Sequence, residues 1–475
     1  MNYRIRHKIV ITLAFVFLNL IQGYSQENNL HYLIEVNSSL SSNKTLPFWM
    51  VSNKFGAVPN SNNLFLNTAF YSDFQKPESN FDFSYKASLT GYTALESNLQ
   101  INELYGSFRY KKLLLDIGVK NNDILWEGLS SSNGNIVLSN NSRSFPGYNL
   151  QLIDYTQLPF AKKWLSVKGN YSDYLLNDPR IIDNTRLHYK SLFFKTKMSS
   201  KLEVITGVSH YAQWGGTSSI TGKQPSSFSD YLRVISGNSG GSDALEADQV
   251  NVLGNHIGSY LFQLNYKGDK TNWNFYYSHP FEDRSGREMQ NWRDGLYGLF
   301  IDLKQPKAII THLLAEFTYT KHMSGGSIHY TDENGEPVKA RGRDDYFNNG
   351  VYISGWTYFG NTIGSPYFTT TPIDENGITQ GVIQGDNRFK AFNVGIKGYF
   401  FNTPYKAMLS HTTYYGWFDN EYNPKPMQLS GVLEVIMATQ KKFPFEITLG
   451  AAIDTGTYNP VNFGGFLKLT KRGRF

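Results

Sequence analysis

The sequence has no cysteine among its 475 residues. This absence excludes disulfide frameworks, CxxC zinc sites, iron–sulfur clusters and cysteine nucleophiles together. Charged residues are also scarce, at 18 % of the sequence. The 45 Lys and Arg exceed the 39 Asp and Glu only slightly, which gives a formal net charge of +6. So weak an excess over this length predicts no nucleic-acid partner. The mean hydropathy of −0.39 excludes a polytopic helical membrane protein, which needs several apolar runs of about 20 residues.

Catalytic motifs are few, and each has a non-catalytic interpretation. The run Gly237–Gly241 fits the GxSxG pattern around Ser239, but that motif needs a strand before it and a helix after it. Here it lies in a Ser- and Gly-rich stretch typical of a loop. Two acidic pairs, Glu282–Asp283 and Asp344–Asp345, fall in expected loops, where acids are usually solvated. No P-loop, dinucleotide fingerprint, HExxH or EF-hand pattern is present, so we expect no catalytic residue, metal or cofactor.

The N-terminus has the three parts of a secretory signal. Basic residues precede a single apolar run, Ile9–Ile21, and the small residues Gly23 and Ser25 then stand at −3 and −1 of a cleavage position before Gln26. An uncleaved membrane anchor is the alternative, and the shortness of the run disfavours it. The sequence therefore predicts a signal peptide over residues 1–25 and one exported domain over residues 26–475.

Beyond the signal, the hydrophobic pattern has a period of two residues. In Phe81–Thr90 apolar and polar residues alternate without a break, and Phe445–Ala451 repeats the pattern. Such alternation predicts strands, but it does not separate a soluble sandwich from a membrane barrel. Three further features favour the barrel: segments of about ten residues joined by short turns or long polar loops, aromatics clustered at segment ends, and a terminal Phe475 beside the last strand.

The number of strands tests this topology. Both termini of such a barrel face the periplasm, where the turns are short, so the number of strands must be even. Reading back from Phe475 places an even number of strands and returns the N-terminus to the periplasm. The sequence thus predicts an all-β, transmembrane antiparallel barrel of about 18 strands, with long extracellular loops that partly plug the lumen. The strands are expected near 30–40, 64–74, 81–93, 99–110, 112–119, 148–157, 163–174, 187–198, 202–213, 257–266, 272–279, 295–303, 308–320, 389–401, 405–418, 428–439, 445–454 and 461–471. The long loops are expected near 41–63, 120–147, 214–256, 280–294 and 321–388.

Aromatic and amide residues gather in the expected extracellular loops. Sugars offer C–H faces that stack on aromatic rings and hydroxyls that need donors and acceptors. Alternation along the strand before the third of these loops places Ser209 and two candidate residues in the lumen and His210 on the lipid side. Packing inside a loop plug is an equal alternative for any one of these residues. The candidate polysaccharide-binding residues are Tyr211, Gln213, Trp214, Tyr346, Asn348 and Trp356.

Several short blocks, in one order along the mature chain, carry a family resemblance. They are Pro47–Trp49, Ser52–Gly56, Leu115–Lys120, Trp126, Leu129–Ser131, Asn141–Arg143, Pro146–Gly147, Ser209–Gly216, Val252–Gly258, Asn348–Gly350 and Ser354–Trp356. Together they resemble the pattern of Wzi-type capsule assembly proteins. The resemblance implies an outer-membrane barrel of eighteen strands that acts as a lectin and holds capsular polysaccharide on the cell. It also implies a helical periplasmic element near the N-terminus, whereas residues 26–63 show no helical period.

We therefore expect a non-enzymatic protein in the outer membrane of a gram-negative bacterium. Its expected partners are capsular or other surface polysaccharide, outer-membrane lipid, and the barrel assembly machinery, which would recognise the terminal Phe475. A diffusion porin or polysaccharide export conduit is the first alternative, because a barrel of this size is wide enough for a channel. An outer-membrane hydrolase or acyltransferase using Ser239 or the loop acids is the second.

Overall fold

The computed structural model describes residues 29–475 except positions 77, 95–96, 162, 251, 283, 325–328, 332–334, 336, 340–343, 419 and 440–442. The signal peptide expected over residues 1–25 lies outside the described residues and stays a prediction. Within the described ranges, no helix has the length and apolar character needed to cross a membrane.

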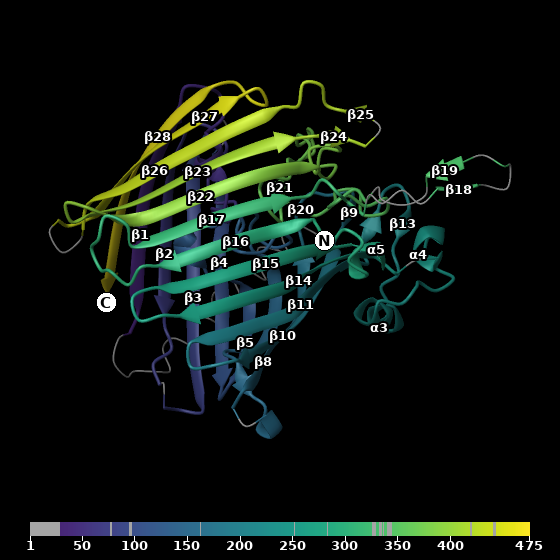
Figure 1. Cartoon of the computed structure of the whole chain (residues 1–475), viewed down its shortest axis with the longest axis horizontal. Coiled ribbons are helices and arrows are strands. Elements are labelled where there is room, and N and C mark those ends of the chain that lie inside the picture. The colour runs from purple at the N-terminus through teal and green to yellow at the C-terminus, as the bar shows by residue number, and fades with distance from the viewer. Residues whose placement is uncertain are drawn as a thin grey trace, which may run out of the picture.

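The chain forms one closed antiparallel barrel (Figure 1). Each strand pairs with its sequence neighbours, and pairing between the first and last strands, with Ile34 opposite Lys471, closes the wall. Because closure leaves no free edge, every backbone group of the wall can find a partner within the barrel. The wall strands are β1 (His31–Ser41), β2 (Asn63–Ser72), β3 (Phe81–Thr93), β4 (Ser97–Tyr110), β5 (Leu113–Val119), β6 (Pro146–Leu152), β8 (Leu165–Leu176), β10 (Thr185–Lys197), β11 (Leu202–Trp214), β14 (Asn255–Lys267), β15 (Asn272–Phe281), β16 (Gly295–Asp302), β17 (His312–Tyr319), β22 (Phe389–Phe400), β23 (Thr403–Tyr414), β26 (Met427–Ala438), β27 (Glu446–Gly456) and β28 (Asn462–Arg474).

The predicted strand count is confirmed. The short strand β7 (Thr156–Gln157) follows β6 in the chain and pairs with the same strand, β8. Strands β6 and β7 therefore occupy one position in the wall, and the barrel has 18 strands. Every expected strand range overlaps one of them. The helices are α2 (Phe48–Val51), η1 (Trp126–Gly128), η2 (Pro159–Ala161), α3 (Phe228–Ser236), α4 (Glu246–Val250) and α5 (Arg284–Arg287). The small loop strands are β9 (Ile182–Asp183), β12 (Thr217–Ser218), β13 (Gly222–Lys223), β18 (His329–Thr331), β19 (Pro337–Lys339), β20 (Thr357–Tyr358), β21 (Asn361–Thr362), β24 (Gly416–Trp417) and β25 (Asn420–Glu421).

Alternation along the strands separates a lipid-facing surface from a polar lumen. On β27 the outward Leu449 is 43 % exposed, while the neighbouring Thr448 is buried on the inner side. Leu467, opposite Leu449 on β28, is also exposed. This pattern of apolar residues outside and polar residues inside is that of a membrane barrel.

The two ends of the barrel differ, and we call them the loop end and the turn end. Figure 1 shows β18, β19 and helices α3 to α5 gathered at the loop end, with the C-terminus at the opposite, turn end. Long segments emerge at the loop end, as expected, while the wall strands are joined by shorter segments at the turn end. The loop-end segments are 42–62, 120–145, 215–254, 282–294 and 320–388.

Three of these segments fill the lumen at the loop end, and we call them together the plug: residues 42–62, 120–145 and 344–388. The main hydrophobic cluster lies here, and it includes the fully buried Leu129, Phe347 and Trp356. Phe48 of α2 stacks on Tyr367, with ring centroids 5.5 Å apart. The expectation that long loops partly plug the lumen is therefore confirmed. Helix α2 is the single helix between residues 29 and 63, so the helical element implied by the resemblance does not appear there.

Candidate functional site

Three of the predicted binding residues meet where the plug contacts the inner wall. Gln213, on the lumen side of β11, donates from Nε2 to the Gly355 carbonyl at 3.1 Å. The Trp356 indole next to it donates to the Val137 carbonyl at 2.7 Å. The Tyr211 ring lies edge-on to Trp356, 5.4 Å between centroids. These contacts join the two largest plug segments to the wall.

Two more predicted residues organise the plug itself. The Tyr346 hydroxyl donates to Asp294 Oδ2 at 2.7 Å. Asn348 makes a reciprocal pair with Val382: its Nδ2 donates to the carbonyl at 3.0 Å, and its Oδ1 accepts from the amide at 2.8 Å. Burial raises the pKa of the Asp294 carboxyl to about 7. Asp294 also accepts the backbone amides of residues 322 and 323, so it fixes the start of the longest loop to the barrel rim.

Trp214 is separated from the other five residues. It ends β11 on the outer face of the wall, where its ring stacks on Tyr231 of α3 at 5.2 Å and the Arg186 guanidinium lies 4.8 Å from it. His210 lies on the same outer face, as alternation predicts, with its Nε2 2.9 Å from His256 Nδ1. The structure therefore does not bring Trp214 into the lumen.

Accessibility decides between the two interpretations that the sequence leaves open for these residues. Tyr211, Gln213, Trp214, Tyr346 and Trp356 are all at most 4 % exposed, and Asn348 is half-buried. Side chains so buried cannot contact a polymer without moving the plug. The structure thus favours packing as the immediate role of these six residues.

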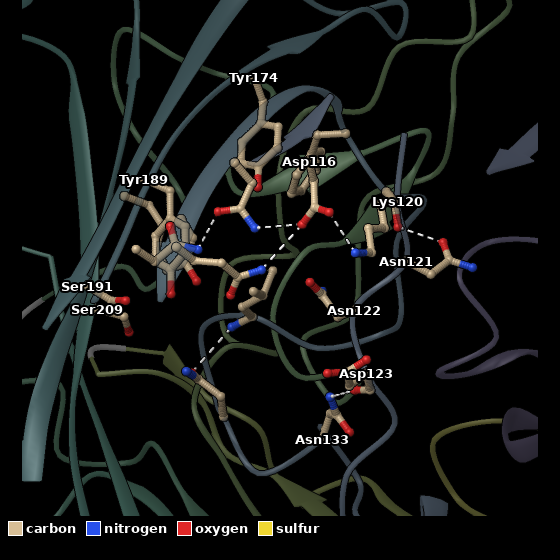
Figure 2. A pocket seen from close by; sticks show the side chains of 18 of the residues that line it. Asp116, Lys120, Asn121, Asn122, Asp123, Asn133, Tyr174, Tyr189, Ser191 and Ser209 are labelled. Carbon is tan, nitrogen blue, oxygen red and sulfur yellow. Dashed lines mark hydrogen bonds and ion pairs between the residues drawn. The ribbon is translucent and has the colours of Figure 1, made fainter. Parts of the chain in front are cut away.

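A cavity of about 510 Å³ lies in the lumen beside the plug (Figure 2). Its centre is Asp116 of β5, which pairs with Lys120 at 2.7 Å. The other carboxylate oxygen accepts from the amides of Asn149 and Gln151, at 3.4 and 3.3 Å. Asn170 of β8 donates to Asn149 at 2.5 Å and extends the row of amides. Figure 2 shows Tyr174 and Tyr189 on the same side of the cavity.

A second cavity of about 430 Å³ adjoins the first and shares Phe55 and Asn121 with it. The Lys86–Glu103 ion pair crosses it at 2.5 Å. Both cavities reach residues near the turn end, Tyr155 in the first and Leu33 in the second. We call the two cavities the inner chambers. Sequence reasoning missed their lining, although polar residues at period two in 149–151 and 168–172 carry the signal.

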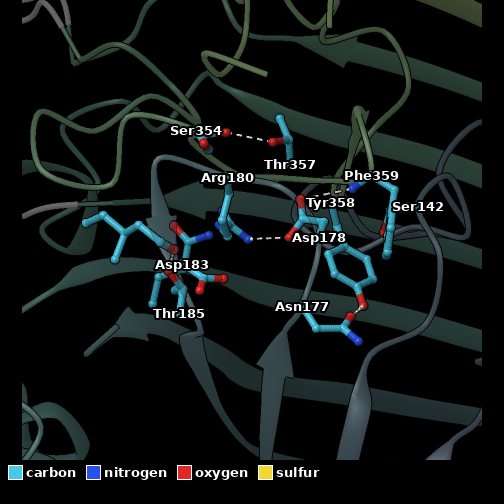
Figure 3. A network of polar contacts seen from close by, with 12 residues as sticks. Ser142, Asn177, Asp178, Arg180, Asp183, Thr185, Ser354, Thr357, Tyr358 and Phe359 are labelled. Carbon is cyan, nitrogen blue, oxygen red and sulfur yellow. Dashed lines mark hydrogen bonds and ion pairs between the residues drawn. The ribbon is translucent and has the colours of Figure 1, made fainter. Parts of the chain in front are cut away.

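The loop-end side of the first chamber is closed by aromatic packing. The ring of Phe145, the last residue of plug segment 120–145, lies 5.6 Å from Tyr174 of the wall and 5.2 Å from Tyr358 of the plug. Figure 3 shows the polar network around Tyr358, in which the Tyr358 hydroxyl donates to Asn177 at 2.5 Å and Asp178 pairs with Arg180 at 3.2 Å. Burial raises the pKa of the Asp178 carboxyl, although Arg180 opposes this rise. The rim and the plug are therefore joined by buried polar contacts.

Glu316 of β17 anchors the plug deeper in the lumen. Its carboxylate accepts the Ser130 hydroxyl at 2.5 Å and the Ser131 amide at 2.7 Å. From the wall it accepts the Tyr276 hydroxyl at 2.6 Å and Asn393 Nδ2 at 3.1 Å. Glycine at position 395 allows the close approach, because a Cβ there would lie 2.8 Å from Leu129 Cβ. One buried carboxylate thus joins the plug to three wall strands.

The residues considered for catalysis have structural contacts. Ser239 follows the left-handed Gly237 that ends α3, so a helix precedes the GxSxG run. Glu282 accepts the Phe347 amide at 2.6 Å, and Asp344 accepts the Ser324 hydroxyl at 2.5 Å. Asp345 accepts from Asn348 at 3.1 Å. Asp283 lies outside the described residues. These contacts assign the described acids to plug packing.

A family model described as "Capsule assembly protein Wzi" matches residues 68–372, more than half of the chain. Among solved structures, the Wzi outer-membrane protein of Escherichia coli group 1 capsule assembly, described as a carbohydrate-binding β-barrel, is similar at 13 % identity and a TM-score of 0.57, covering 92 % of this chain and 83 % of that one. OprD from Pseudomonas aeruginosa matches at 9 % identity and a TM-score of 0.46, covering 96 % of each chain. No curated protein sequence matches significantly.

Proposed function

The chain belongs to the Wzi family of capsule assembly proteins, and we propose that it retains surface polysaccharide by binding the polymer on its loop end. Family and fold place it in the outer membrane of a gram-negative bacterium as a β-barrel, and the family is one of non-enzymatic proteins. The polysaccharide itself is our proposal for this chain. It is supported by the E. coli relative, which is a carbohydrate-binding barrel of the same fold.

The observation that carries the proposal is the hydrogen-bonded closure of the loop end. Plug segments from distant parts of the chain are held at Glu316, Gln213 and Asp294. A diffusion channel needs an open lumen, whereas a binding protein needs a fixed outer surface. The closed loop end therefore favours retention of the polymer over its passage.

The six predicted residues would act in binding by fixing the loops that touch the polymer. Gln380 and Gln384 are exposed on the same plug segment as Trp356, and the Gln384 amide lies 3.5 Å from Asp345. Such amides pair sugar hydroxyls as donors and acceptors. Each neutral hydrogen bond adds only about 1 kcal/mol, so we expect weak single sites and strong binding through repeated polymer units.

Substitution of Trp356 by Ala tests the proposal. Loss of this buried indole leaves a large void and the Val137 carbonyl unpaired, so the plug surface should deform while the barrel remains. We expect polysaccharide to be released into the medium at unchanged barrel abundance. Trp164→Ala is the matched control, since that indole is 51 % exposed near the turn end. Cells that keep their capsule with the Trp356→Ala barrel would contradict the proposal.

An export conduit is the second candidate, and the inner chambers favour it. Their amide and hydroxyl linings suit a sugar chain that enters from the turn end. Passage requires the plug to move, so channel recordings separate the two functions. A closed wild-type barrel that nevertheless retains capsule supports binding.

Two further partners belong to the proposal. Outer-membrane lipid would cover the outward apolar belt, which includes Leu449 and Leu467. The barrel assembly machinery would recognise Phe475, which is 61 % exposed and packs beside Tyr32 with 5.2 Å between ring centroids. An aromatic residue presented at the turn end is accessible from the periplasm.

A further inference from the structure

Two loop-end segments lie against the outside of the barrel, and the second of them also contacts the plug through Asn291 and Asp294. We call residues 227–237, which contain α3, and 284–294 together the collar. The Tyr231 hydroxyl of α3 donates to Asp173 at 2.6 Å and lies 2.6 Å from the Tyr171 hydroxyl. Both partners are on the outward face of β8, because the intervening Ser172 is bonded to Asn149 in the lumen. Helix α3 therefore lies against the outer wall.

The collar sits where the outward residues change from apolar to aromatic and polar. On β14 the change is from Phe262 to Tyr260, whose hydroxyl donates to the Arg287 carbonyl at 3.2 Å. On β15 it is from Phe275 to Tyr277, whose hydroxyl donates to the Trp292 carbonyl at 2.7 Å. Aromatic girdles of this kind mark the level of lipid head groups. The collar is thus hydrogen-bonded to the girdle itself.

At the α3 end of the collar the same change occurs on β10. Leu192 is 45 % exposed on the outer face, and two residues nearer the loop end Lys190 donates from Nζ to the Ile235 carbonyl. Ile235 is in the last turn of α3. Both segments of the collar therefore reach the girdle level from the loop end.

The outer face of α3 is apolar and uncovered. Phe228 is 75 % exposed and Leu232 is 51 % exposed, and their spacing of four residues places them on one side of the helix. Ile235 continues that side one turn later. Asp230 and Val234 face the barrel and are buried, and Asp230 forms a capping box with Ser227 that fixes the start of the helix. The helix thus presents apolar side chains away from the protein.

We propose that α3 is an in-plane helix seated in the outer leaflet of the membrane, with Phe228, Leu232 and Ile235 among the lipid acyl chains. The occupant is lipid because this face adjoins the lipid-facing belt: Lys190, which donates to the last turn of α3, is two residues from the exposed Leu192 on the same outer face. A helix of this kind lies with its apolar side at the boundary between head groups and acyl chains. The exposed Trp292 and Met289 of the second segment extend the same contact along the girdle.

The absence of cysteine makes the proposal directly testable by single-site spin labelling. The test uses the Leu232→Cys barrel, nitroxide-labelled, in phosphatidylcholine vesicles, and compares label accessibility to oxygen and to a water-soluble nickel complex. Arg233→Cys is the matched control, because Arg233 is the next residue of the same helix, about 100° around its axis from Leu232, and its side chain is 38 % exposed. Leu192→Cys and Asn238→Cys supply the lipid and water references.

We expect the oxygen-to-nickel ratio at position 232 to match that at 192 and to exceed the ratio at 233 and 238 several-fold. A ratio at 232 equal to that at 238 would overturn the proposal. So would magnetic coupling between labels at 232 that disappears on dilution with unlabelled barrel, because that result identifies a second copy as the occupant. Heat-modifiable gel migration establishes that each labelled barrel is folded, so both outcomes are readable.

Discussion

Replacement of Glu316 by Ala should release the plug. The carboxylate accepts four hydrogen bonds, two of them from Ser130 and Ser131 of the plug. A hydrogen bond to a charged group contributes about 1.5–3 kcal/mol, so loss of the two plug bonds weakens docking by about 4 kcal/mol. Since about 1.4 kcal/mol changes an equilibrium tenfold, the undocked fraction should rise by a factor on the order of 1,000.

Planar-bilayer recordings measure this change as the frequency of open events. Glu127→Ala is the matched control on the same plug segment, because Glu127 pairs with Lys397 at 2.6 Å with both side chains about 40 % exposed. An exposed pair of this kind contributes about 0–1 kcal/mol, so the control should stay nearly as closed as the wild type. Glu316→Gln keeps one acceptor oxygen, so its frequency of open events should lie between those of the Glu316→Ala barrel and the wild type. If Glu316→Ala barrels are as closed as Glu127→Ala barrels, Glu316 is not the anchor.

Three further predictions concern the wall, the terminus and the rim. Leu449→Arg should destabilise the barrel by about 2–4 kcal/mol if residue 449 lies at the bilayer midplane, as measured by urea unfolding in lipid, with Leu449→Ala as the comparison. Deletion of Phe475 should lower the amount of assembled barrel and leave export intact, and normal surface levels would count against it. The Asp294 carboxyl has a pKa raised from 3.8 to about 7, so the folded state holds a proton that the unfolded state releases, and rim stability should fall as pH rises between these values. Hydrogen exchange of the backbone amides of residues 322 and 323 measures this pH dependence of rim stability, and Asp294→Asn should remove it. If the pH dependence is unchanged in Asp294→Asn, a group other than Asp294 causes it.

The barrel could be predicted from the sequence because its wall follows one local rule. A period of two residues, set by the pleat, holds along the wall strands whatever their partners, and it is interrupted at the register shifts of the β3–β4 and β26–β27 pairings. Errors fall where the wall leaves that rule. The strand expected at 405–418 ends at Tyr414, because Gly416 adopts a φ of 75° and turns the chain into β24. The strand expected at 148–157 is split into β6 and β7.

The candidate site could be predicted only in part. Alternation correctly placed Tyr211 and Gln213 in the lumen and His210 outside. Burial could not be inferred, because it depends on which loops meet. Trp356 is enclosed by the segment around Val137, more than 200 positions earlier in the chain. Similarly, the outward Trp214 is covered by a helix from the loop that follows it, which no strand pattern indicates.

The position of the plug anchor has a consequence for the order of assembly. The plug segment 120–145 connects β5 and β6, but its anchor Glu316 is on β17, and Asn393, which also binds that carboxylate, is on β22. The anchor site therefore does not exist until the wall has been built as far as β22. A barrel inserting strand by strand would pass through a stage in which its lumen is lined but open. Docking of the plug is then a late event of folding, and a defect confined to the anchor, at Glu316 or Asn393, would leave a leaking pore rather than an unfolded protein.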